Sequence, residues 1–261
     1  MKKLLNLVIA ALFFQSAIAQ VSIDRTKPPA AGPAPVIAIK DPYITVLANG
    51  ITVVVVENHK LPRVRASLNI DRGPIVEGKK AGVMNLMGQM LEEGTVSRSK
   101  ADFDEAVDMM GADLNMNSSG GSISSLTRYF DKSFELFSDA LRHPSFPQES
   151  FDKLRTLTLT NLKSSEKSAS VIGGRVTTAL SFGKQTALGE FTTEESVKGL
   201  TLNDVKDAYK NYITPSRSYL VFVGDITPAA AKTIALKYLG NWTGVTLPVP
   251  AVPSTENPAK T

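Results

Sequence analysis

The fold of this chain is decided by the stretch AGVMNLMGQMLEEGT, residues 81–95. Its apolar side chains recur at the three- and four-residue spacing that places them on one face of a helix. Asn85 and Gln89 are four residues apart, so they project from the same side of that helix, one turn from each other. Gly88 lies inside the pattern, where glycine costs about 1 kcal/mol relative to alanine. The stretch therefore predicts one amphipathic helix, closed by Gly94.

The composition indicates a globular protein of ordinary make-up. The chain has 261 residues, 43% hydrophobic and 21% charged, which is ample for a packed core in one large domain or two small ones. It has no cysteine, so no disulfide stabilises it. The formal net charge is only +4. This small excess gives no reason to expect a nucleic-acid partner.

Residues 1–19 have the pattern of a signal peptide. Lys2 and Lys3 precede an apolar run over residues 4–14, and small residues at 17–19 predict cleavage after Ala19. The run is too short to span a membrane, so a retained anchor is the weaker alternative. We expect a periplasmic or secreted protein with no membrane span after cleavage.

Four regions follow from the distribution of proline and of periodic segments. Residues 1–19 are the signal peptide, 20–41 a leader rich in proline and alanine, 42–244 the folded domain, and 245–261 a proline-rich linker or tail.

Within the domain, hairpin signals dominate. Asn49-Gly50 separates two strand-like runs, a third strand spans 64–71, two more lie around Gly120-Gly121, and a buried one covers 218–223. Helical patterns cover 99–110, 148–163, 168–182, 201–212 and 227–239, and another begins at Asp131 as its cap. The predicted class is α+β, a mostly antiparallel sheet with helices packed on one face.

The organising stretch resembles the zinc helix of the pitrilysin/insulinase family of metallopeptidases. That helix carries the inverted motif HxxEH within a pattern close to G-x-x-H-x-x-E-H-M-L-x-x-G-T. The frame of the pattern is present here in its glycine, methionine, leucine and threonine positions: Gly82, Met90, Leu91, Gly94 and Thr95. Weaker similarities to the same family, which occur along the chain in the family's order, extend from Tyr43 to Gly244. The resemblance implies one half of a clam-like pair of the kind found in mitochondrial processing peptidase.

The residues that carry the family's chemistry are replaced. Asn85 and Gln89 stand at the two zinc-ligand positions, and Gly88 stands at the general-base position. Alignment through the helix after Pro-x-Phe puts the family's third ligand, a glutamate, at Asn161; a rival alignment brings Glu166 near that position instead. Carboxamides are weak zinc donors, and glycine cannot accept a proton from a metal-bound water. We therefore expect no cofactor in this chain, with zinc only in an intact partner.

Other candidate residues have ordinary explanations. His59 and His143, the only histidines, lack the neighbours of a metal site and are expected to face solvent. Glu92 and Glu93 follow the helix and are expected to be solvated charges rather than catalytic acids.

The residues Asn115, Met116, Asn117 and Ser118 correspond to a strand that, in the family, is an exposed edge to which substrate peptide adds as a further strand. The alternative is an edge blunted by polar residues or covered by a second half.

Three functions remain open. The leading hypothesis is an exported, non-catalytic homologue that acts as the partner half or subunit of an active zinc peptidase and helps hold extended peptides. The first alternative is an active zinc metalloendopeptidase with unusual ligands or a catalytic partner half. The second is a purely structural assembly subunit. Since the resemblance covers one half, either the sequence is a fragment or its partner half is a separate chain.

Overall fold

The computed structural model describes Gly32 and residues 41–249. The predicted signal peptide, nearly all of the predicted leader and the end of the predicted tail lie outside the described residues. No helix among the residues described combines the length and apolarity needed to cross a membrane.

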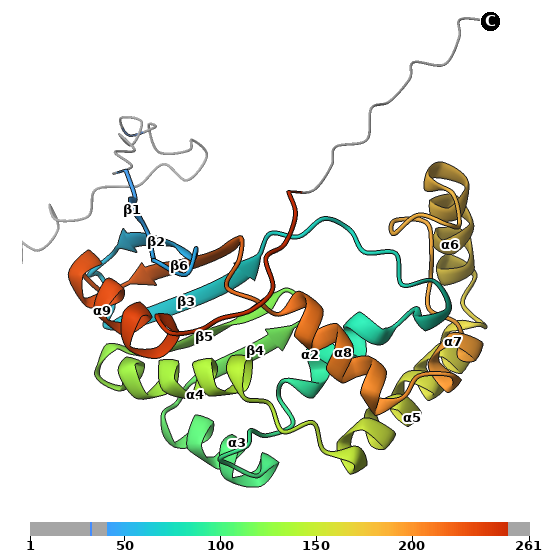
Figure 1. Cartoon of the computed structure of the whole chain (residues 1–261), viewed down its shortest axis with the longest axis horizontal. Coiled ribbons are helices and arrows are strands. Elements are labelled where there is room, and N and C mark those ends of the chain that lie inside the picture. The colour runs from blue at the N-terminus through green and yellow to red at the C-terminus, as the bar shows by residue number, and fades with distance from the viewer. Residues whose placement is uncertain (1–31, 33–40, 250–261) are drawn as a thin grey trace, which may run out of the picture. The chain divides into compact units, whose positions relative to one another are not determined.

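A six-stranded sheet forms the centre of the domain, in the order β1-β2-β6-β3-β5-β4 (Figure 1). Its strands are β1 (Tyr43–Val46), β2 (Thr52–Glu57), β3 (Arg63–Ile70), β4 (Asp113–Asn117), β5 (Gly120–Leu126) and β6 (Ser218–Gly224). Every neighbouring pair is antiparallel except β2 and β6, which run parallel. The mostly antiparallel sheet and the α+β class are thus confirmed.

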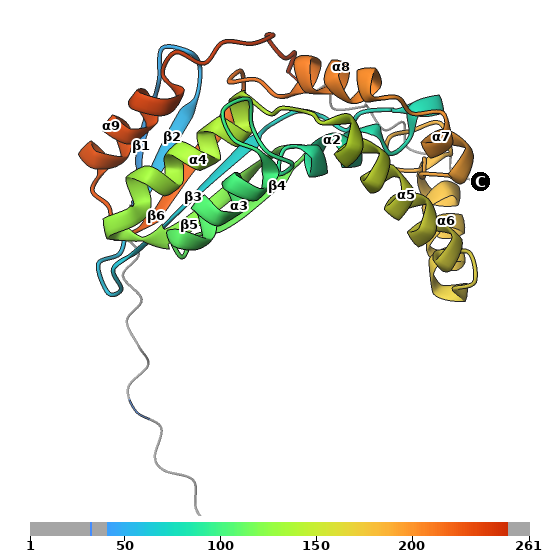
Figure 2. The ribbon, with the colours of Figure 1, turned by 90° about the horizontal axis from the view of Figure 1, so that it is seen from below.

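One face of the sheet is covered by helices, as the alternation in β3 requires. Val64, Ala66, Leu68 and Ile70 are buried while the residues between them are exposed or half-exposed. Helices α3 (Lys100–Met109), α4 (Phe130–Arg142) and α9 (Pro228–Leu239) lie on the buried side (Figure 2). Phe134 of α4 stacks on Phe222 of β6 with 5.5 Å between ring centroids, so aromatic packing joins helix and sheet.

The remaining helices gather at one end of the sheet in Figure 1. They are α2 (Val83–Met90), α5 (Gln148–Ser165), α6 (Ala169–Phe182), α7 (Glu194–Lys198) and α8 (Leu202–Tyr212), and two 3₁₀ turns cover Gly78–Lys80 and Thr127–Tyr129. Helix α2 contacts α8, α5 and strand β4. It therefore stands where the sheet meets the second group of helices.

The predicted single helix over 81–95 is shorter than expected. Gly82 has φ 103° and precedes α2 as its cap, while Glu77 Oε2 accepts the N–H groups of Gly82 and Met84. Helix α2 ends at Met90, after which i→i+3 bonds tighten the chain toward Gly94, whose φ is 91°. Because Gly82 and Gly94 both adopt left-handed geometry, the chain turns at each of these two glycines.

Two local predictions were wrong and one helix was missed. The turn between β4 and β5 is made by Ser118-Ser119, whereas Gly120 and Gly121 belong to β5. A Cβ on Gly121 would lie 2.5 Å from the Asn115 carbonyl oxygen, so this glycine permits close strand pairing. Asp131 lies inside the first turn of α4 and bonds Lys237 at 2.8 Å instead of capping the helix. The five-residue α7 is too short to show a periodic pattern.

Candidate functional site

The three residues predicted to stand at vacated ligand positions line one pocket of about 430 Å³ between α2, α5 and α6. Helix α2 contributes Asn85 and Gln89, and α5 contributes Asn161. Gln89 Nε2 donates a hydrogen bond to Asn85 Oδ1 at 2.6 Å, so these two carboxamides are bonded to each other. We call this space the vacated pocket. Glu166, the ligand of the rival alignment, follows the last residue of α5 and does not line it.

These residues do not fit a zinc ion. Zinc sites in proteins use imidazole, thiolate or carboxylate groups, and the three carboxamides here carry no negative charge. Arg175 of α6, which also lines the pocket, would repel a cation. Across the part of the chain that the structure describes, no three histidine, cysteine, aspartate or glutamate side chains gather at a position that could hold a metal.

Gly88, which is predicted to stand at the general-base position, has no room for a side chain. Gly88 is buried, and a Cβ built on it would lie 2.5 Å from the Ser118 nitrogen and 2.7 Å from the Asn117 carbonyl carbon. Real Cβ atoms do not approach backbone this closely. Helix α2 and the end of β4 are therefore packed against each other at a separation that only glycine allows.

Glu92 is not the solvated charge predicted from the sequence. Its side chain is half-buried, and Oε1 accepts the backbone N–H of Met116 at 2.5 Å. Burial raises the pKa of Glu92 above its usual value, and the hydrogen bond from Met116 opposes that rise. Glu93 is also half-buried. Glu92 thus links the end of the organising stretch to β4.

Strand β4 is an edge of the sheet, since β5 is its only strand neighbour within the described residues. Asn115 and Asn117 are exposed, the side chain of Met116 is buried, and Ser118 falls in the turn after the strand. Glu92 already accepts the N–H of Met116, so part of the outer edge is in use. The predicted peptide-binding edge, Asn115 to Ser118, therefore stays a prediction, and the N–H of Met116 is already occupied.

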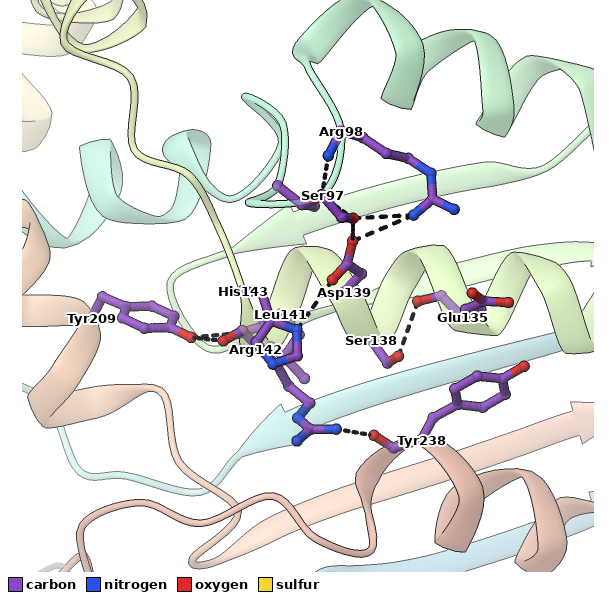
Figure 3. Close-up of polar contacts among 11 residues, drawn as sticks. Ser97, Arg98, Glu135, Ser138, Asp139, Leu141, Arg142, His143, Tyr209 and Tyr238 are labelled. Carbon is purple, nitrogen blue, oxygen red and sulfur yellow. Dashed lines mark hydrogen bonds and ion pairs between the residues drawn. The ribbon is translucent and has the colours of Figure 1, made fainter.

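A second polar cluster lies beside α4 and is drawn in Figure 3. Ser97 Oγ donates to Asp139 Oδ2 at 2.7 Å, while Arg98 and His143 lie 3.5 Å and 3.1 Å from the same carboxylate. Burial opposes ionisation of Asp139, but hydrogen bonds from neighbouring side chains outweigh it and hold its pKa below the usual value. The cluster ties the segment after α2 to α4, which is a supporting role.

Both histidines pair with aspartates. His143, exposed at the end of α4, contacts Asp139, and exposed His59 bonds Asp225 Oδ1 through Nδ1 at 2.6 Å. The expectation of solvent-facing histidines is right. The Asp139 partner of His143 lies four residues earlier in the chain, whereas the Asp225 partner of His59 lies 166 residues away and could not be found from the sequence.

The family assignment follows from the comparisons. The sequence model described as insulinase, peptidase family M16, matches residues 52–188, and the model described as peptidase M16 inactive domain matches residues 199–261. The chain belongs to the insulinase family. The pitrilysin/insulinase resemblance is therefore confirmed.

One of the curated relatives is named as a non-peptidase homolog. The chain is 24% identical over 183 residues to a non-peptidase homolog, YmxG, of Helicobacter pylori, covering 67% of this chain and 42% of the relative. It is 25% identical over 229 residues to the mitochondrial-processing peptidase subunit beta of Mus musculus, covering 84% and 46%. The chain thus spans less than half the length of these curated relatives.

Solved structures share the fold. A peptidase M16 inactive domain from Pseudomonas fluorescens superposes with a TM-score of 0.72 at 19% identity, over 84% of this chain and 54% of that one. The periplasmic protease PqqL of Escherichia coli gives 0.69 at 15% identity, over 83% and 26%. Together with the replaced residues, these findings describe a non-catalytic member of the insulinase family.

Proposed function

We propose that this chain is exported and serves as the partner half or subunit of a catalytically intact homologue, in which it helps hold extended peptides. The observation that carries the proposal is the contrast within α2. The frame that positions the helix is kept, while Asn85, Gly88 and Gln89 replace the groups that bind metal and move protons. A scaffold kept without its chemistry suits a role in assembly or binding.

Two further observations support partnering. One curated relative is named as a subunit of the mitochondrial processing peptidase. The ferredoxin protease FusC, whose structure gives a TM-score of 0.65, was solved in complex with Arabidopsis ferredoxin. One protein with this fold thus engages another polypeptide.

Export is supported by the pattern of residues 1–19 and by the fold shared with a periplasmic protease. If export occurs as proposed, the periplasmic form begins at Gln20. N-terminal sequencing of protein recovered from the periplasmic fraction tests this directly, and an intact Met1 would contradict it.

The central experiment is co-expression with a homologue from the same genome that carries an intact HxxEH motif. We expect one stable complex by light scattering, and peptide hydrolysis by that complex which exceeds that of the homologue alone. A matched preparation in which the homologue's motif glutamate is replaced by glutamine should assemble but not hydrolyse. Failure of the two chains to associate would refute the proposal.

A further inference from the structure

We propose that the vacated pocket binds the C-terminal carboxylate of a peptide that ends in an apolar residue. This inference rests on the proposed role in peptide binding and names the end of the peptide that the chain recognises. It is carried by the charge, the hydrogen-bond donors and the shape of the pocket.

The charge of the pocket is the reverse of that of a metal centre. Its lining contains no aspartate or glutamate, and its one charged side chain is Arg175. The Arg175 guanidinium lies over the ring of Phe191, 5.3 Å from the centroid, and pairs with no carboxylate among the described residues. A planar guanidinium held by an aromatic ring is suited to receive a carboxylate through two parallel hydrogen bonds.

Amide donors complete the polar side. Gln89 donates to Asn85 Oδ1, and Asn85 Nδ2 donates to none of the described residues, so its two hydrogens can bond another acceptor. The side chain of Asn161 makes no hydrogen bond to the described residues, and it lines the same space. An anion that entered would therefore meet neutral donors from two helices and one cation from a third.

The rest of the wall is mixed, with the hydroxyl side chains of Thr158, Ser165 and Thr192 beside apolar ones. Leu157, Leu162 and Val171 line the pocket next to these polar groups. A volume of about 430 Å³ lies within the range of small-ligand pockets, and mixed apolar walls with a few convergent polar groups are typical of them. The last residue of a peptide offers both features in one unit, a carboxylate and an adjacent side chain.

The test compares two probes. One is a fluorescein-labelled hexapeptide of alanine and serine that ends in leucine with a free carboxylate, and the other is its C-terminal amide. Fluorescence anisotropy with the folded protein should give a Kd for the acid about tenfold or more below that for the amide, since hydrogen bonds to a charged group are the stronger kind.

Variants locate the effect. Arg175→Gln should remove the preference for the acid, and Asn161→Asp should weaken binding of the acid without weakening the amide, because it places a negative charge in the pocket. Arg128→Gln is the matched control: Arg128 also lies over an aromatic ring, 4.7 Å from the centroid of Tyr129, but outside the pocket. It should keep the preference.

Equal binding of acid and amide, an unchanged preference in Arg175→Gln, or binding of neither probe would overturn the inference. Assembly with the intact homologue is measured on the same preparations by light scattering. A chain that assembles without preferring the acid overturns the pocket assignment alone. A chain that prefers the acid but does not assemble overturns the proposed partner role alone.

Discussion

Gly88→Ala should not stabilise the protein, although alanine is the better helix former. The new Cβ would lie 2.5 Å from the Ser118 nitrogen and 2.7 Å from the Asn117 carbonyl carbon. Both atoms belong to the backbone and cannot rotate away, so α2 and the β4–β5 turn must separate. The separation would disturb a buried contact next to the hydrogen bond between Glu92 and Met116.

The magnitude follows from two opposing effects. Alanine in place of a mid-helix glycine gains about 1 kcal/mol of helix propensity. Inserting a methyl group into closely packed surroundings costs about 1–3 kcal/mol. The propensity gain can be measured separately at Gly173 of α6, where a Cβ meets nothing within 4 Å. The difference between the two variants should therefore equal the packing cost, about 1–3 kcal/mol.

The assay is urea unfolding of wild type, Gly88→Ala and Gly173→Ala, followed by circular dichroism. We expect the Gly173→Ala midpoint to lie at or above that of wild type and the Gly88→Ala midpoint to lie below that of Gly173→Ala. If both variants shift the midpoint upward by the same amount, α2 and β4 are not in the close contact described, and position 88 has room for a side chain.

Three further predictions concern individual side chains. Burial raises the folded-state pKa of Glu92 above 4.5, so wild type should lose stability relative to Glu92→Gln as pH rises from 4.5 through that folded pKa. Thermal melts of both proteins from pH 4 to 7 measure this. A difference in melting temperature that stays constant with pH would contradict the prediction. The hydrogen bond to Asp225 raises the pKa of His59 above 6.5, so the pair stabilises the fold fully below pH 6.5 and less as pH rises through the folded pKa. An NMR titration of His59 should show a midpoint above 6.5 that falls in Asp225→Asn. A midpoint that does not move in this variant would disprove the pairing. Thr201 caps α8 by accepting the Asp204 N–H, so Thr201→Ala should lower the free energy of unfolding in urea by about 1 kcal/mol. Thr201→Ser, which keeps the hydroxyl, should stay close to wild type. Equal losses of stability in the two variants would contradict the capping role.

The strands and most helices could be predicted because their signals are local. Asn49-Gly50 turns the first hairpin, and Ser99, Thr201 and Thr227 each accept a backbone N–H at the start of a helix, as their sequence patterns indicate. Errors arose where tertiary contacts decide the outcome. Gly121 looked like a turn residue, but its missing side chain serves close strand pairing.

In the site too, residues with a local sequence signal could be predicted and those that depend on tertiary contacts could not. The replaced residues Asn85, Gly88 and Gln89 are readable from a motif of fixed spacing. The contribution of Arg175 is not, because nothing in an isolated helix reveals which neighbour it faces. The burial of Glu92 was missed for the same reason: its partner, the backbone of Met116, lies 24 residues away and carries no sequence signal.

The zinc content of the purified chain tests whether α2 and α5 can hold a metal ion. After equilibration with excess zinc and gel filtration, elemental analysis should find far less than one zinc per chain, and a chelator should leave the melting temperature unchanged, because Asn85, Gln89 and Asn161 supply only neutral carboxamides. One retained zinc per chain, lost on Gln89→Ala, would contradict the account.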